Sequence, residues 1–178
     1  MRPSPPVLIV LGGLPATGKS TVARELNRDG ALSYVRIDSI EQALHASGEM
    51  GNGGVQGAGY AVGYAVAGDL LDGGNDVLAE CVNPLPVTRD AWRETARAHN
   101  AVLIEVELLC SDPAIHRERA ESRDVDIPGL EVPDWQAIRA REYHPWDDAG
   151  VLRIDTVETS PQDAAAAIRA AVSAASIC

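Results

Sequence analysis

The stretch Gly13-Leu14-Pro15-Ala16-Thr17-Gly18-Lys19-Ser20 follows the apolar run 7–11 and precedes the helical pattern 21–26. This order predicts a strand, a glycine-rich turn and a helix. Glycines make a loop thin enough for backbone N–H groups to surround a polyphosphate, and the helix N-terminus adds the positive end of its dipole. In the G-x-x-x-x-G-K-[ST] pattern the lysine reaches the β- and γ-phosphates and the final hydroxyl joins the shell of Mg²⁺. The stretch therefore predicts a site for a triphosphate.

This interpretation assigns residues to the predicted site. The residues expected to bind the nucleotide are Gly13, Leu14, Pro15, Ala16, Thr17, Gly18, Lys19, Ser20 and Thr21. Lys19 is expected to be catalytic and to face solvent when no ligand is bound, and Ser20 is expected to be a metal ligand.

The composition limits the class of protein. A length of 178 residues predicts one compact domain over residues 1–178. The formal net charge of −11 argues against nucleic acid as a partner, because such proteins have a basic face. Cys81, Cys110 and Cys178 are odd in number and widely spaced, which indicates neither a disulfide framework nor a zinc site. The apolar run near the N-terminus is too short for a secretory segment or a membrane span, so we expect a cytoplasmic protein.

Apolar segments alternate with helical patterns along the rest of the chain. Expected strands cover 33–38, 76–82, 101–109 and 151–155, and expected helices cover 39–45, 60–72, 87–99, 134–143, a segment from Asp112-Pro113 to Arg123, and an alanine-rich end after Ser160. This alternation predicts βαβ units and a parallel sheet. The glycine-rich residues 48–59 predict a mobile loop that closes over a substrate or, alternatively, an insertion without contacts.

Asp38 ends the second expected strand. The carboxyl ends of strands in doubly wound sheets face the ligand crevice, so Asp38 should point there. A carboxylate beside the phosphates can orient an acceptor hydroxyl and take its proton. The alternative is an N-cap for the helix that begins at Ser39.

Three arginines lie on the helix that follows the fourth expected strand. Phosphoryl transfer spreads negative charge over the γ-phosphoryl oxygens, and a guanidinium can compensate it. Arg119 and Arg123 are four residues apart and share a helical face, so we expect these two to be catalytic. Arg117 fits a surface pair with Glu121, and a solvated role is the alternative for each arginine.

The loop 13–20, Asp38, this arginine-bearing helix and the late Ile154-Asp155-Thr156 together resemble the P-loop small-molecule kinases. Among these are the gluconate, shikimate and adenylylsulfate kinases and the kinases resembling chloramphenicol phosphotransferase. The resemblance implies an α/β P-loop NTPase fold, a three-layer sandwich with a five-stranded parallel sheet and helices on both faces. It further implies ATP, Mg²⁺, a lid at about 117–133, and contact of Asp38 with the acceptor.

The resemblance also assigns Glu80, at the end of the third strand, to the position that steers Mg²⁺. Here Cys81 and Val82 follow it, without the usual aspartate pattern. A water-mediated metal contact, an acceptor contact and a local pairing of the carboxylate therefore stay open, and Asn83 is a weaker candidate for the same pocket.

The prediction for function is an ATP-dependent kinase that transfers the γ-phosphoryl group to a hydroxyl of a small molecule such as an antibiotic or a sugar acid. One alternative is a nucleotide or nucleoside kinase. Another is a nucleotide-binding ATPase or a polynucleotide-end kinase module. Homo-oligomerisation is left open. The four histidines lack metal-ligand spacing, and Trp135, Tyr143 and Trp146 are expected to pack in the core, with an aromatic wall for the acceptor as the alternative.

Overall fold

A computed structural model describes residues 4–48 and 57–175. Most of the predicted glycine-rich loop at 48–59 lies outside the described residues, and so does Cys178. Among the described helices, none is long and apolar enough to cross a membrane.

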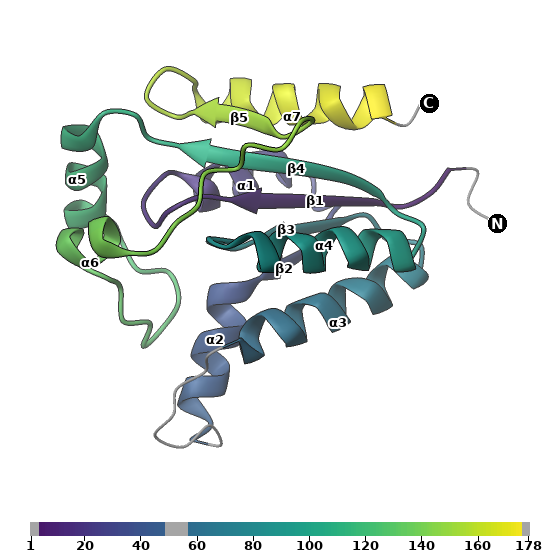
Figure 1. Ribbon diagram of the computed structural model, residues 1–178, viewed down its shortest axis with the longest axis horizontal. Coiled ribbons are helices and arrows are strands. Elements are labelled where there is room, and N and C mark those ends of the chain that lie inside the picture. The colour runs from purple at the N-terminus through teal and green to yellow at the C-terminus, as the bar shows by residue number, and fades with distance from the viewer. Residues whose placement is uncertain (1–3, 49–56, 176–178) are drawn as a thin grey trace.

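The described residues form a five-stranded sheet with helices in alternation (Figure 1). The strands are β1 (Val7–Gly12), β2 (Ser33–Arg36), β3 (Val77–Glu80), β4 (Val102–Leu109) and β5 (Leu152–Asp155). Their spatial order is β2-β3-β1-β4-β5, and every neighbouring pair is parallel. The helices are α1 (Lys19–Leu26), α2 (Ile37–Ala46), α3 (Ala58–Asp72), α4 (Pro86–Ala98), α5 (Pro113–Ser122), α6 (Trp135–Ala140) and α7 (Pro161–Ala175). The predicted α/β fold with a parallel sheet is confirmed.

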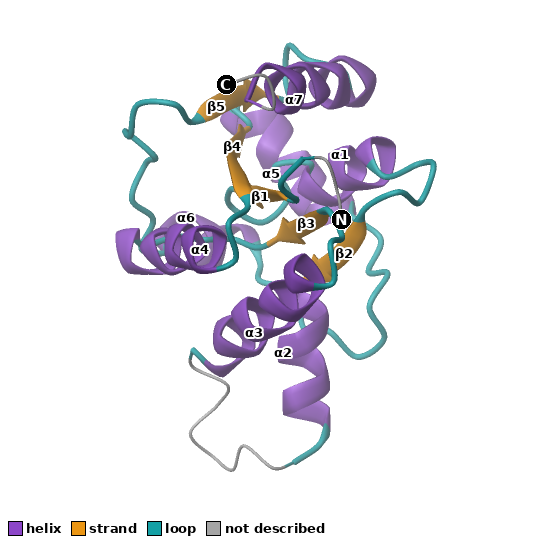
Figure 2. Cartoon of the chain, turned by 90° about the vertical axis from the view of Figure 1, so that its right-hand side faces the viewer, coloured by secondary structure: helices purple, strands orange, loops and turns teal. Residues whose placement is uncertain are grey.

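Helices cover both faces of the sheet, which gives three layers (Figure 2). On one face Ile9 and Leu11 of β1 pack with side chains of α1 and α7, and on the other Leu8 and Val10 pack with side chains of α3 and α4. Successive strand residues point to opposite faces, so a strand covered on both sides is apolar throughout. The apolar run before the glycine-rich loop therefore forms the central strand β1, which is buried along its whole length.

The second strand is shorter than predicted. β2 ends at Arg36, and α2 begins at Ile37 with no intervening loop. Asp38 therefore lies in the first turn of α2, and its predicted positions as a strand end and as an N-cap are wrong. Ile37 is fully buried, and a Cβ atom on Gly63 of α3 would lie 2.3 Å from its Cδ1 atom. The alternating pattern did not reveal that packing against α3 starts the helix two residues early.

The ends of helices α5 and α6 follow from N-cap residues and from extended residues after each helix. Asp112 caps α5 as predicted, with its carboxylate accepting from the N–H groups of Ala114 and Ile115 at 2.8 and 3.2 Å. Arg123 is extended, with ψ of 137°, and ends that helix. Helix α6 is shorter than the predicted 134–143, because Asp134 is its N-cap and Arg141 is extended, with ψ of 131°, and ends it.

Candidate active site

The glycine-rich loop doubles back between β1 and α1. Gly13, Ala16 and Gly18 have φ of 141°, 66° and 95°. At Gly13 a side chain is also excluded by space, because a Cβ atom would lie 2.3 Å from the carbonyl oxygen of Leu108. Ala16 adopts this conformation at a cost of roughly 1–2 kcal/mol, and such strain is concentrated at functional sites. The Gly13 N–H donates to the Val82 carbonyl at 3.1 Å, which joins the loop to the chain after β3.

The loop ends at an uncapped helix N-terminus. The first N–H groups of a helix have no intrahelical acceptor, and no side chain caps α1 at Gly18. Gly18, Lys19, Ser20 and Thr21 all line one cavity. The uncapped N-terminus of α1 and the positive end of its dipole thus border that cavity, which is the arrangement that binds phosphate.

Lys19 is buried, so the expectation that it faces solvent is wrong. Its side chain turns back on the loop, and Nζ donates to the carbonyls of Gly13 and Leu14 at 2.8 Å each. Burial lowers the pKa of Lys19, while the carboxylates of Glu80 and Asp38 oppose that shift. The ammonium group is thus held by carbonyl oxygens that phosphate oxygens can replace.

Ser20 and Glu80 come together across sixty residues of sequence. The Ser20 hydroxyl donates to Oε1 of Glu80 at 2.5 Å, and Glu80 is only 3 % exposed. Among the described residues, no group of three or more His, Cys, Asp and Glu side chains is placed to hold a metal ion by itself. Mg²⁺ in phosphoryl-transfer sites keeps several waters and takes one or two protein ligands plus substrate phosphates. The hydroxyl–carboxylate pair fits that mode of binding.

Glu80 also has local partners, an alternative that the sequence left open without identifying the residues. It accepts a hydrogen bond from the Tyr34 hydroxyl, and Nε of Arg36 lies 3.7 Å from its Oε2 atom. Burial and Glu80 raise the pKa of Tyr34 well above its usual value. Tyr34 and Arg36 occupy alternate positions of β2 and therefore share a face. An alternating strand does not indicate which buried carboxylate its polar residues will meet.

Asp38 lines the same cavity from the first turn of α2 and is half-buried. Burial lowers the pKa of both Lys19 and Arg123, and the Asp38 carboxylate opposes that shift in each. The structure thus brings together the predicted lysine, carboxylate and one predicted arginine.

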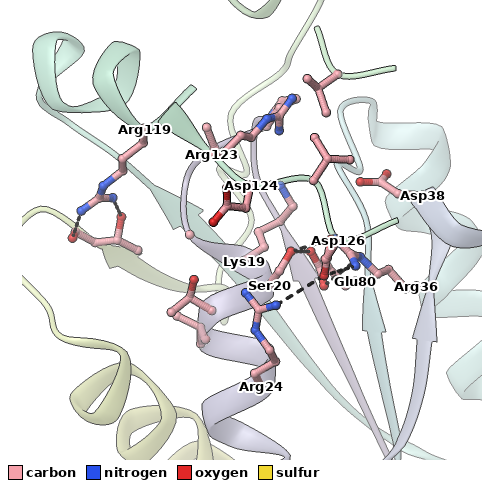
Figure 3. A pocket seen from close by; sticks show the side chains of 18 of the residues that line it. Lys19, Ser20, Arg24, Arg36, Asp38, Glu80, Arg119, Arg123, Asp124 and Asp126 are labelled. Carbon is pink, nitrogen blue, oxygen red and sulfur yellow. Dashed lines mark hydrogen bonds and ion pairs between the residues drawn. The ribbon is translucent and has the colours of Figure 1, made fainter. Parts of the chain in front are cut away.

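The two predicted catalytic arginines point in different directions (Figure 3). Arg119 donates to Oγ1 and to the carbonyl of Thr156 at 2.7 and 3.0 Å. Arg123 has buried Nε and Nη2 atoms without a hydrogen-bond partner, and burial lowers its pKa. The shared helical face does not persist, because Arg123 lies just beyond the end of α5. Arg117 pairs with Glu121 at 2.8 Å on the surface, as predicted.

The cavity has a volume of about 620 Å³, in the range of ligand sites. The glycine-rich loop 13–20, here called the phosphate loop, contributes Pro15, Ala16, Gly18, Lys19 and Ser20 to its lining. The loop 123–134 that follows α5 contributes Asp124, Val125, Asp126, Leu130 and Val132. Asp126 is tied down by Arg36 at 2.8 Å and by Arg24 at 3.3 Å. These residues of the loop 123–134 therefore border the same cavity as the phosphate loop.

Other singled-out residues have packing roles. Trp146 is fully buried, and the Tyr143 hydroxyl donates to Glu107 at 2.7 Å. His116 is buried, with Nε2 2.8 Å from the Pro15 carbonyl and its ring 5.1 Å from that of Trp135. His116 thereby joins α5 and α6 to the phosphate loop.

The chain matches a known protein family over most of its length. A family model described as an AAA domain matches residues 8–142, from β1 through α6. The chain belongs to the AAA domain family. The match covers the phosphate loop, Asp38, Glu80 and both arginines of this AAA domain. No curated protein matches the chain.

Solved structures share the fold of this AAA domain. A gluconokinase from Sinorhizobium meliloti is 17% identical, with a TM-score of 0.67, over 99% of this chain and 96% of that chain. The Mycobacterium tuberculosis APS kinase CysC, in complex with AMPPNP and APS, is 19% identical, with a TM-score of 0.70, over 96% and 99%. Chaetomium thermophilum Kti12, in complex with ADP-AlF3, is 20% identical, with a TM-score of 0.69, over 95% and 98%. The resemblance to P-loop kinases is confirmed at the level of the fold.

Proposed function

We propose that the protein is an ATP- and Mg²⁺-dependent kinase that transfers the γ-phosphoryl group to a hydroxyl of a small molecule. The single observation that carries the proposal is the content of one cavity. It combines the phosphate loop with the uncapped N-terminus of α1, the Ser20–Glu80 pair suited to Mg²⁺, the unpaired donors of Arg123 and the Asp38 carboxylate. Phosphoryl transfer requires positioning and charge compensation from the protein, and these groups supply both.

The proposed nucleotide spans the cavity from Arg119 to Lys19. N–H groups at the start of α1 and the Lys19 ammonium bind the β- and γ-phosphates. Figure 3 shows Arg119 and Asp38 on opposite sides of Lys19. Thr156, which Arg119 holds, also donates to the Thr17 carbonyl at 2.9 Å, so the chain after β5 borders the phosphate loop. We assign the base to the Arg119 side and the acceptor to the Asp38 side.

Ser20 and Glu80 are the residues that would hold Mg²⁺, Ser20 directly and Glu80 directly or through water. When bound, Mg²⁺ neutralises charge on the β- and γ-phosphate oxygens. The role of the protein is to keep the Ser20 hydroxyl and the Glu80 carboxylate adjacent at the end of β3.

Asp38 and Arg123 act on the transferring group. The Asp38 carboxylate accepts the proton of the acceptor hydroxyl as its oxygen attacks the γ-phosphorus, with ADP leaving. The unpaired donors of Arg123 compensate the negative charge that spreads over the transferring phosphoryl oxygens. Arg119 reaches that group only by leaving Thr156, so we assign charge compensation to Arg123 first.

The similar structures leave more than one class of acceptor open for the proposed kinase. The similar structures include a gluconokinase and an APS kinase, whose acceptors differ in chemistry, so a nucleotide or nucleoside kinase remains the alternative within enzymes. Kti12 in complex with ADP-AlF3 favours a second candidate, a nucleotide-binding ATPase.

A coupled ADP-release screen tests the proposal. The parent and Lys19→Ala are assayed with ATP, Mg²⁺ and a panel of sugars, sugar acids, antibiotics and nucleosides. A kinase releases ADP faster when its acceptor is present, and Lys19→Ala abolishes that rate because the β/γ charge is no longer neutralised. Unchanged turnover in Lys19→Ala would overturn the assignment of the loop. Slow ATP hydrolysis that no compound in the panel accelerates would favour the ATPase.

A further inference from the structure

Arg36 lies beside Glu80 at the carboxyl end of the sheet. The two residues occupy paired positions on the neighbouring parallel strands β2 and β3. Arg36 lines the cavity, and its side chain is only 16% exposed. A guanidinium is therefore built into the wall of the site, next to the residues proposed to hold Mg²⁺.

This guanidinium joins three groups of the site (Figure 3). Nη2 of Arg36 donates to Oγ of Ser20 at 3.2 Å, and Nη1 donates to Oδ2 of Asp126 at 2.8 Å. Its Nε atom lies 3.7 Å from Oε2 of Glu80 and has no hydrogen-bond partner. One cation thus links the metal-binding hydroxyl and carboxylate to the loop 123–134.

Arg36 and a divalent cation need the same partners. The Ser20 hydroxyl uses its proton on Glu80, so its lone pairs are shared between Arg36 and any metal that binds there. Two cations at adjacent positions repel each other, and they do so more strongly where the surroundings are partly buried.

We propose that Arg36 is a resident cation of the metal site, which contacts Ser20 and Glu80 in place of Mg²⁺ in the nucleotide-free protein and must leave Ser20 when Mg²⁺ and nucleotide bind. This inference rests on the proposed function, because it requires that the cavity binds a nucleotide with Mg²⁺.

The displacement extends to the loop 123–134 through Asp126. Asp126 is the carboxylate that Arg36 holds most closely, and its other ion pair is to the exposed Arg24. Movement of Arg36 away from Ser20 changes the geometry of its bond to Asp126. Metal occupancy and the position of this loop are therefore coupled, and Arg36 acts as a positioning residue for both.

The experiment measures how Mg²⁺ promotes ADP binding, and it needs no acceptor. Calorimetry gives the affinity for ADP first in EDTA, without Mg²⁺, and then at a series of increasing Mg²⁺ concentrations. The parent and Arg36→Met are compared. Removal of the competing cation and loss of charge compensation at Glu80 both favour Mg²⁺. The half-effect Mg²⁺ concentration, at which half of the Mg²⁺-dependent increase in ADP affinity is reached, should fall about tenfold. That factor corresponds to the loss of about one hydrogen bond to a charged group.

Asp126→Asn is the second variant and keeps the test valid if Arg36→Met does not fold. It weakens the hold on Arg36 while Ser20 and Glu80 stay intact, so the half-effect Mg²⁺ concentration should fall by a smaller factor. Amide hydrogens of residues 123–134 should also exchange faster in the nucleotide-free variant. Glu131→Gln is the matched control, since it removes an exposed carboxylate from the same loop, and both readouts should match the parent.

The outcomes separate this inference from the proposed function. If ADP binds to the variants and the half-effect Mg²⁺ concentration is unchanged or higher in Asp126→Asn and in any folded Arg36→Met, the inference is overturned and the proposed function stands. That result is expected if Arg36 stays in place and binds the phosphates. If the parent does not bind ADP at all, the proposed function fails and the inference fails with it.

Discussion

Replacing Asp38 with Asn tests the proposed proton transfer. Asp38 lines the cavity near Lys19 and Arg123, and Asn keeps nearly its shape but cannot take a proton at neutral pH. General-base catalysis contributes about 10²–10⁴-fold. We therefore expect kcat to fall by that factor, which corresponds to about 2.7–5.4 kcal/mol in the activation free energy.

The structural cost of the same substitution is much smaller. A carboxylate in the first turn of a helix gains about 0.3–1 kcal/mol from the helix dipole. Burial raises the pKa of Glu41, one turn further along α2, and the Asp38 carboxylate adds to that shift. The repulsion between the two carboxylates offsets part of the gain from the dipole. No side chain caps α2, so no capping hydrogen bond is lost. The free energy of unfolding should change by less than about 1 kcal/mol.

The assay compares three quantities in Asp38→Asn and in the control Glu41→Gln. These are kcat by coupled ADP release at saturating ATP and acceptor, ATP affinity by calorimetry, and stability by denaturant unfolding. Glu41→Gln removes a carboxylate from the same helix, at a position outside the described lining of the cavity. The reasoning is refuted if Asp38→Asn keeps kcat within about threefold of the parent, well below the general-base range. An equal loss of kcat in Asp38→Asn and Glu41→Gln would assign the loss to the removal of a negative charge and not to proton transfer. Glu80 would then be the next carboxylate to test.

Arg123→Ala should lower kcat more than Arg119→Ala, because Arg123 has buried unpaired donors beside the phosphate site whereas Arg119 is held by the chain after β5; equal kcat values at saturating ATP would contradict this. Gly13→Ala should destabilise the fold by about 2–4 kcal/mol in thermal unfolding, from a strained positive φ and a 2.3 Å contact with a backbone oxygen. The Arg36 guanidinium holds the pKa of Asp126 below its usual 3.8. The ion pair is therefore fully formed at neutral pH, and its contribution to stability is lost as pH falls through that lowered pKa. A stability difference between parent and Asp126→Asn should be present at neutral pH and shrink as the solution is acidified below the usual pKa, and a constant difference would refute the assignment.

The sequence by itself determined the parts of this protein that depend on neighbouring residues. The glycine spacing of the phosphate loop, the Asp112 cap of α5 and the apolar central strand are local patterns, and each appears where it was predicted. These features follow from backbone freedom, unpaired helix donors and burial on both faces of a strand. The glycine spacing predicted a nucleotide site, and the alternation of apolar segments with helical patterns predicted the parallel sheet.

Only the tertiary structure decided which side chains meet inside that site. Ser20 finds Glu80 sixty residues away, and Arg36 finds Asp126 ninety residues away. Arg119 and Arg123 diverge because the helix between them ends. Hydrogen bonds and ion pairs depend on distances of a few ångström between groups that are remote in sequence. The pairing of β2 with β3 in the sheet, for example, brings Arg36 beside Glu80. For that reason Lys19, Asp38 and Glu80 could be assigned to the site from the sequence, whereas Asp126 and the contacts of Arg36 could not.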